Sequence, residues 1–127
     1  MFDKNYSPSG NEISDFTDAF LECALWTATD EEGNPLDENY SMEDYAEETI
    51  AKAKKECEEF ILANMELLHG LDPKQCGHDF SLTRDGHGTG FWDRGYGKVG
   101  EELSEICRPY GEAPVYAGDD GKLYIFG

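Results

Sequence analysis

Basic residues are scarce in this chain. Its 127 residues include 10 Lys and Arg against 28 Asp and Glu, which gives a formal charge of −18. A surface this negative repels phosphates, which excludes a conventional nucleic-acid-binding protein, and it favours positively charged partners. Apolar residues make up 39% of the chain and aromatic residues 13%. That share is too large for a disordered acidic tail, so we expect a folded protein.

Long apolar runs are missing as well. No run approaches the roughly 18 residues that a membrane span needs. The first residues, Met-Phe-Asp-Lys-Asn, lack the basic-then-apolar pattern of a secretion signal. We therefore expect a cytoplasmic protein that has no contact with a membrane. The length fits a single domain over 1–127, in which the polar residues 1–12 form a flexible arm.

The four cysteines are far apart, and none forms the closely spaced pair that is typical of a structural zinc site. Three of them fall on the apolar faces of expected helices, so we interpret them as reduced core residues of an intracellular protein. The acidic loop over 30–38 lacks the alternating ligand spacing of a calcium-binding EF-hand. The sequence therefore predicts no metal and no cofactor.

The spacing of apolar residues predicts three helices, over 14–26, 47–68 and 98–110. Alternation predicts a strand over 78–84, a glycine-rich turn and a returning strand over 89–93. A last hairpin joins 114–117 to 122–126 through a Gly-Asp-Asp-Gly turn. The fold class expected is α+β, with three helices packed on a small antiparallel sheet of about four strands in two hairpins.

The negative charge is concentrated in the first half of the chain. Residues 1–70 hold 18 acids and 4 bases, whereas residues 71–127 hold 10 acids and 6 bases. The 30–48 segment holds nine acids and no base, and three acids of the first expected helix have no base within reach. The twelve candidate partner-binding residues are Asp15, Asp18, Glu22, Asp30, Glu31, Glu32, Asp37, Glu38, Glu43, Asp44, Glu47 and Glu48.

Uncompensated acids at helical spacing call for an explanation, because like charges one turn apart cost a few tenths of a kcal/mol per pair. Such carboxylates lie about 5–6 Å apart, a distance broadly similar to that between phosphates along a nucleic-acid strand. A folded surface of this kind could occupy a Lys- and Arg-rich groove built for DNA. The alternative is that the charge serves solubility alone.

The 77–95 segment is the densest local signal and holds two histidines, three aspartates and two arginines. One interpretation is a small hydrolase or metal-dependent enzyme that uses His78 and His87 with Asp79 and Asp93. No nucleophile elbow, zinc-protease or phosphate-loop motif accompanies them. The glycines and aromatic residues equally fit a structural hairpin, in which Arg84 pairs with an aspartate of the same segment. We favour the structural interpretation and predict no catalytic residue.

The string GHDFSLTRDGHGTGFWDRG, preceded by FLECALWTATDEEGNPLDENYS and followed by the GDDG hairpin, resembles a family of small acidic proteins encoded by tailed bacteriophages. The similarity covers most of the chain, from residue 20 onward. The family carries no well-established activity, so the resemblance implies a context: expression inside an infected bacterium. Small acidic phage proteins there often block host DNA-binding machinery, including restriction enzymes, CRISPR complexes, gyrase and RNA polymerase.

The leading hypothesis is therefore a non-enzymatic phage inhibitor that acts as a DNA mimic and occupies the basic groove of a host DNA-binding protein. It would not bind nucleic acid itself. A homodimer would extend such a surface, although no residue pattern demands one. The hydrolase or metal-binding enzyme is the first alternative. The second is a phage accessory protein that binds its partner through an apolar surface around Trp92 and Tyr96.

Overall fold

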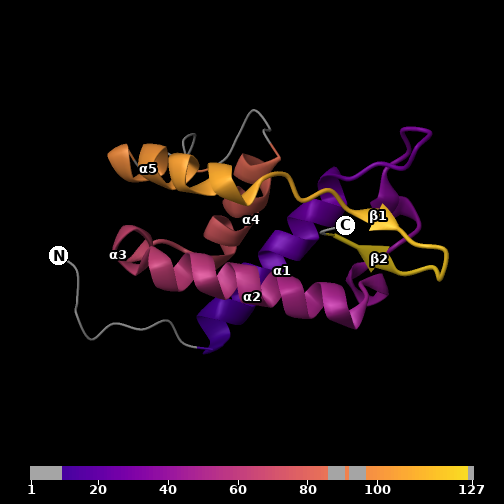
Figure 1. The fold of residues 1–127 in the computed structure, drawn as a ribbon, viewed down its shortest axis with the longest axis horizontal. Coiled ribbons are helices and arrows are strands. Elements are labelled where there is room, and N and C mark those ends of the chain that lie inside the picture. The colour runs from indigo at the N-terminus through magenta and orange to yellow at the C-terminus, as the bar shows by residue number, and fades with distance from the viewer. Residues whose placement is uncertain (1–9, 86–90, 92–96, 126–127) are drawn as a thin grey trace.

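A computed structural model describes residues 10–85, 91 and 97–125. In chain order its elements are α1 (Gly10–Thr27), η1 (Leu36–Glu38), η2 (Met42–Asp44), α2 (Glu47–Ala63), α3 (Met65–Leu68), α4 (Pro73–Arg84), α5 (Lys98–Cys107), η4 (Arg108–Tyr110), β1 (Tyr116–Ala117) and β2 (Leu123–Tyr124). The described chain is mostly helical and has one two-stranded sheet (Figure 1). The predicted α+β fold with about four strands is therefore wrong.

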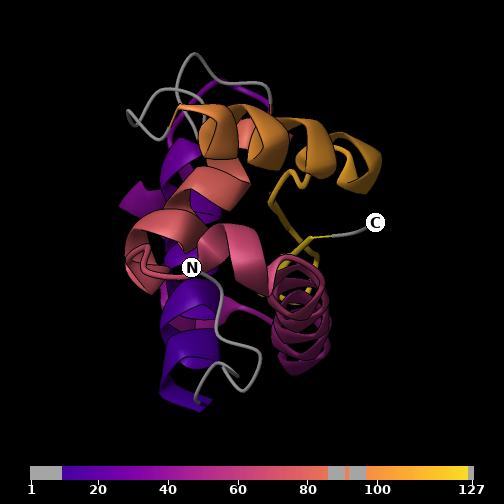
Figure 2. The ribbon, with the colours of Figure 1, turned by 90° about the vertical axis from the view of Figure 1, so that its left-hand side faces the viewer.

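The centre of the fold is the contact between α1 and α4, the most extensive between any two elements. Phe16 and Phe20 of α1 meet Phe80 of α4, with ring centroids 5.7 and 5.4 Å apart. Phe60 of α2 stacks on Phe80 at 4.3 Å. In Figure 2, α2 is seen almost end-on beside α1, and α5 lies across the top. Three helices thus share one aromatic core.

The close approach of α1 and α4 depends on Gly77. A Cβ atom at this position would lie 2.1 Å from the backbone oxygen of Phe16, a separation that real side chains do not reach. The reason for glycine here is therefore the contact between two helices. It is not a turn of the chain.

Helix α4 replaces the strand that the sequence predicted over 78–84. It begins at Pro73, the first helical position, where the absent N–H and the fixed φ of proline suit a helix. Its buried residues Cys76, Phe80 and Arg84 recur every four positions, which is a helical spacing. The alternation of a few residues over 78–84 could not distinguish the two structures. The returning strand over 89–93 lies outside the described residues except for Phe91, which is buried.

The long helix expected over 47–68 is interrupted. Helix α2 ends at Ala63, Asn64 adopts φ −129° and ψ 26°, and α3 begins at Met65. The Asn64 side chain donates a hydrogen bond of 2.8 Å from its Nδ2 to the backbone oxygen of Phe60, so a side-chain amide satisfies a carbonyl that the helix end would leave free. At the other end of the chain, α1 begins at Gly10, inside the predicted arm, and residues 1–9 lie outside the described residues.

The C-terminal hairpin is confirmed, although each strand has two residues. Tyr116 pairs with Tyr124 and Ala117 with Leu123 in antiparallel register. The backbone oxygen of Leu123 also accepts a hydrogen bond from the Ala46 nitrogen, which ties the hairpin to the residue before α2. Figure 1 shows the hairpin at one end of the molecule and α3 with the start of α5 toward the other.

The cysteines behave as the sequence predicted. All four are buried and free, and burial raises the pKa of the Cys57, Cys76 and Cys107 thiols to about 12. They are core residues. Among the described helices, none is long and apolar enough to cross a membrane.

Candidate acidic interface

All twelve acidic residues predicted from the sequence reach solvent. Ten are exposed, and Asp15 and Asp44 are partly buried. The salt bridges of Arg84 with Glu56 and of Arg108 with Glu105 use none of the twelve. Their charges therefore face the solvent without compensation by a recorded ion pair.

The 30–48 segment is an ordered connection between α1 and α2. Its buried anchors are Leu36 in η1 and Tyr45 after η2, each about 5% exposed or less. The Tyr45 hydroxyl donates a 2.8 Å hydrogen bond to the backbone oxygen of Leu21 in α1, and burial raises the pKa of Tyr45 well above its usual value. The acids are therefore carried on backbone that is fixed to the core.

Asp30 shapes the first part of this segment. Its Oδ1 accepts hydrogen bonds of 2.9 Å from the backbone nitrogens of Glu32 and Asn34, and Thr29 forms an antiparallel bridge with Pro35. The hydrogen bond from the Asn34 nitrogen and the smaller contribution from the Glu32 nitrogen lower the pKa of the Asp30 carboxyl. Asp30 thus holds a tight loop whose tip presents its neighbours to solvent.

Asp44 plays the same part around η2. Its Oδ2 accepts a 2.8 Å hydrogen bond from the backbone nitrogen of Ser41, and together they form a capping box. Two of the nine acids between residues 30 and 48 thus fix local backbone, and the other seven are displayed by that segment.

The β1–β2 turn adds two acids that the sequence prediction left out, Asp119 and Asp120, both exposed. The Tyr124 hydroxyl donates to Asp120 Oδ2 at 2.5 Å and the Lys122 backbone nitrogen to Oδ1 at 3.1 Å. These bonds lower the pKa of Asp120, and the first of them raises the pKa of Tyr124 to about 12. The GDDG turn was visible in the sequence. Its place beside the 30–48 segment depends on the bond between Ala46 and Leu123.

The acids of α1 form a separate stripe. Asp18 and Glu22 are exposed one turn apart, and Asp15 lies a turn before Asp18. Along the axis, Asp15 is about 18 Å from the end of α1 at Thr27, at 1.5 Å per residue. Figure 1 shows the N-terminal end of α1 away from the hairpin. The predicted set therefore divides into an acidic end, which we define as residues 30–48, and a stripe on α1.

Helix α5 carries further acids that the prediction also left out. Glu101, Glu102 and Glu105 line a shallow surface hollow with Ile106. Glu105 is paired with Arg108 at 3.3 Å, and both side chains are largely exposed.

The residues of the enzymatic alternative are only partly described. His78 and Asp79 are neighbours on α4; Asp79 is fully buried and accepts a 3.1 Å hydrogen bond from Gln75. The His78 ring lies 5.9 Å from that of Trp26. His87 and Asp93 lie outside the described residues, as do Trp92 and Tyr96. Within the described ranges no three His, Cys, Asp or Glu side chains are grouped to hold a metal ion.

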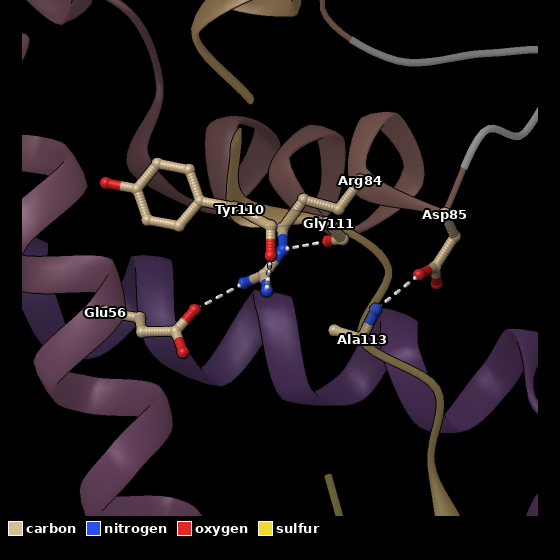
Figure 3. Close-up of polar contacts among 6 residues, drawn as sticks. All are labelled: Glu56, Arg84, Asp85, Tyr110, Gly111 and Ala113. Atoms are coloured by element: carbon tan, nitrogen blue, oxygen red, sulfur yellow. Dashed lines mark hydrogen bonds and ion pairs between the residues drawn. The ribbon is translucent and has the colours of Figure 1, made fainter. Parts of the chain in front are cut away.

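Arg84 forms an ion pair with Glu56 of α2, whereas the sequence suggested an aspartate of the 77–95 segment, which it predicted as a hairpin (Figure 3). Its Nη1 lies 2.8 Å from Glu56 Oε1 on α2, and its Nε and Nη2 donate to the backbone oxygens of Gly111 at 2.9 Å and Tyr110 at 3.1 Å. Asp85 instead accepts a hydrogen bond from the Ala113 nitrogen. Arg84 therefore joins α2 and α4 to the end of η4 and the residue that follows it, which is a structural role.

Comparisons with protein-family models, with curated proteins and with solved structures find no match to this chain.

Proposed function

We propose that this protein is an acidic inhibitor that binds the basic DNA-binding groove of a host protein in the cytoplasm of a phage-infected bacterium, in place of DNA. The phage context comes from the sequence resemblance. The binding mode comes from the charge and from the way the fold displays it.

The observation that carries the proposal is the ordered acidic end. Nine acids and no base fall between residues 30 and 48, and their backbone is fixed by Asp30, Asp44 and the buried Tyr45. Charges on a fixed backbone can match the spacing of cations in a groove, because little entropy is lost when they bind. A groove lined by Lys and Arg would associate with such a surface quickly and in a salt-dependent way.

The test is displacement from DNA. A bacterial lysate is bound to immobilised duplex DNA, the protein is added in solution, and the released proteins are identified by mass spectrometry. We expect a small set of DNA-binding proteins to be released at low salt, and binding to the purified target to weaken steeply as salt rises.

A pair of charge-matched variants separates shape from total charge. Glu31→Gln/Glu32→Gln removes two charges from the acidic end, and Glu101→Gln/Glu102→Gln removes two from α5. We expect the first variant to release less protein than the second. Equal release by both variants, or release that does not depend on salt, would contradict the proposal.

A further inference from the structure

Beside the acidic end lies a hollow that joins it to the hairpin. Its lining residues are Thr29, Asp30, Glu31, Glu32, Leu36, Tyr116 and Ala117. The concave surface thus combines carboxylates from one segment with an aromatic ring and strand backbone from another, nearly ninety residues later. This combination of chemical groups, rather than the acids alone, makes the hollow a candidate contact point.

Tyr116 is an exposed aromatic residue in this hollow. Its side chain is 43% exposed, one of few large apolar side chains in the described chain that reach this level. Its ring stacks on that of Tyr124, with centroids 5.8 Å apart and planes at 22°, and Tyr124 is itself held by Asp120. A ring that is fixed in place and accessible is a surface on which a guanidinium group can stack.

The strand β1 also has an unpaired edge. Leu123 directs its backbone oxygen away from β1, to the nitrogen of Ala46. Opposite residues of an antiparallel pair either exchange hydrogen bonds or both direct their amides outward, so Ala117, the partner of Leu123, directs its N–H and C=O away from β2. In the described chain the sheet has two strands, and no third strand covers this edge at Ala117.

We propose that this hollow binds an arginine side chain carried on an extended segment of the partner protein. The guanidinium stacks on Tyr116 and faces the carboxylates of Glu31 and Glu32, while the segment's backbone pairs with Ala117 in the manner of an added strand. The inference rests on the proposed function, for which it names the contact point. Arginine is favoured over lysine because its planar group stacks on a ring and meets carboxylates in a fork.

The experiment uses the full chain and three short peptides of the form Gly-X-Gly-X-Gly, blocked at both ends, in which X is arginine, lysine or citrulline. Citrulline keeps the shape of arginine without its charge. Binding is followed by amide chemical shifts of the ¹⁵N-labelled protein. We expect the arginine peptide to bind most tightly, the citrulline peptide least, and the shifts to concentrate at Ala117 and the 29–32 loop.

Variants test each group in turn. Tyr116→Leu keeps apolar bulk but removes the ring. We expect it to weaken the binding of the arginine peptide by about two- to five-fold, the range for an exposed cation–π contact, and to have little effect on the binding of the lysine peptide. Glu31→Gln/Glu32→Gln should weaken the binding of both peptides. Glu101→Gln/Glu102→Gln is the charge-matched control and should leave the Ala117 shifts unchanged.

Three results would overturn the inference: equal binding of arginine and lysine peptides, no effect of Tyr116→Leu, or shifts spread over acids throughout the surface. Its failure differs from that of the proposed function. If Tyr116→Leu still releases proteins from DNA as the wild type does, the function stands and the contact point is wrong. If the arginine peptide binds at Ala117 but nothing is released from DNA, the hollow stands and the proposed function is wrong.

Discussion

Replacement of Arg84 by methionine should destabilise the fold strongly. The Arg84 side chain is 2% exposed and its Glu56 partner 27%, and its guanidinium lies 5.1–5.5 Å from the ring centroids of Phe20, Phe80 and Tyr110. Methionine keeps much of the bulk and can contact the rings. It provides none of the donors, so two backbone carbonyls and a carboxylate lose their partner. Loss of one member of a buried pair costs about 3–5 kcal/mol.

The partial exposure of Glu56 favours the lower end of this range, because water can reach the orphaned carboxylate. For 127 residues, an unfolding entropy of about 2.1 cal/mol/K per residue converts ~3 kcal/mol into a fall in Tm of about 11 °C. Thermal unfolding followed by far-UV circular dichroism measures this shift. Arg108→Met is the control, since its pair with Glu105 is exposed and worth less than about 1 kcal/mol. Equal shifts for the two variants would refute the structural role of Arg84.

Three further predictions concern the core and the hairpin. Gly77→Ala should lower the free energy of unfolding, measured in urea, by more than about 2 kcal/mol, because its Cβ would meet the Phe16 backbone. Gly70→Ala is the control: it has open space but a φ of +84°, so it should cost about 1–2 kcal/mol. A smaller loss at Gly77 than at Gly70 would contradict the helix contact. The four buried thiols should react with a thiol reagent at pH 8 only in denaturant, because three of them have a pKa raised to about 12; rapid reaction of the native protein would be inconsistent with this core. Tyr124 should keep its proton until about pH 12. Asp120→Asn should move that ionisation to lower pH in an absorbance titration, since the neutral amide no longer disfavours the phenolate. An unchanged titration would exclude the hydrogen bond between Tyr124 and Asp120.

The sequence predicted the elements whose pattern is local. Helices α1 and α5 have apolar residues at helical spacing, and the last hairpin has a turn that only a few residue types form. The burial of the cysteines followed from their positions on the apolar faces. In each case the signal lies within about twenty residues of chain.

The sequence did not predict helix α4 because this helix is buried on most of its sides. Gly77, Asp79 and Ser81 are buried together with Phe80 and Leu82, so small and polar residues on the buried sides obscure the helical period of the apolar residues. The pair of Arg84 with Glu56 joins residues 28 positions apart. Neither fact has a local signature, because both depend on how α1, α2 and α4 pack.

The sequence likewise predicted only the local part of the candidate site. The count of acids between residues 30 and 48 is a property of the sequence, and so is the absence of bases among them. What the sequence could not provide is the neighbourhood of this segment, since the bond between Ala46 and Leu123 places a hairpin from the end of the chain beside it. Tyr116 therefore gave no signal as a residue of the site.

The fixed backbone of the acidic end is a stronger argument for a binding partner than its charge is. Solubility needs only exposed acids, and flexible ones serve it as well as fixed ones. Here Asp30 and Asp44 hold backbone nitrogens, and Tyr45 fastens the segment to α1. Fixing like charges near one another opposes folding through their repulsion, and a cationic surface that binds there would relieve this repulsion. An interface explains both the charge and the rigidity, whereas solubility explains the charge alone.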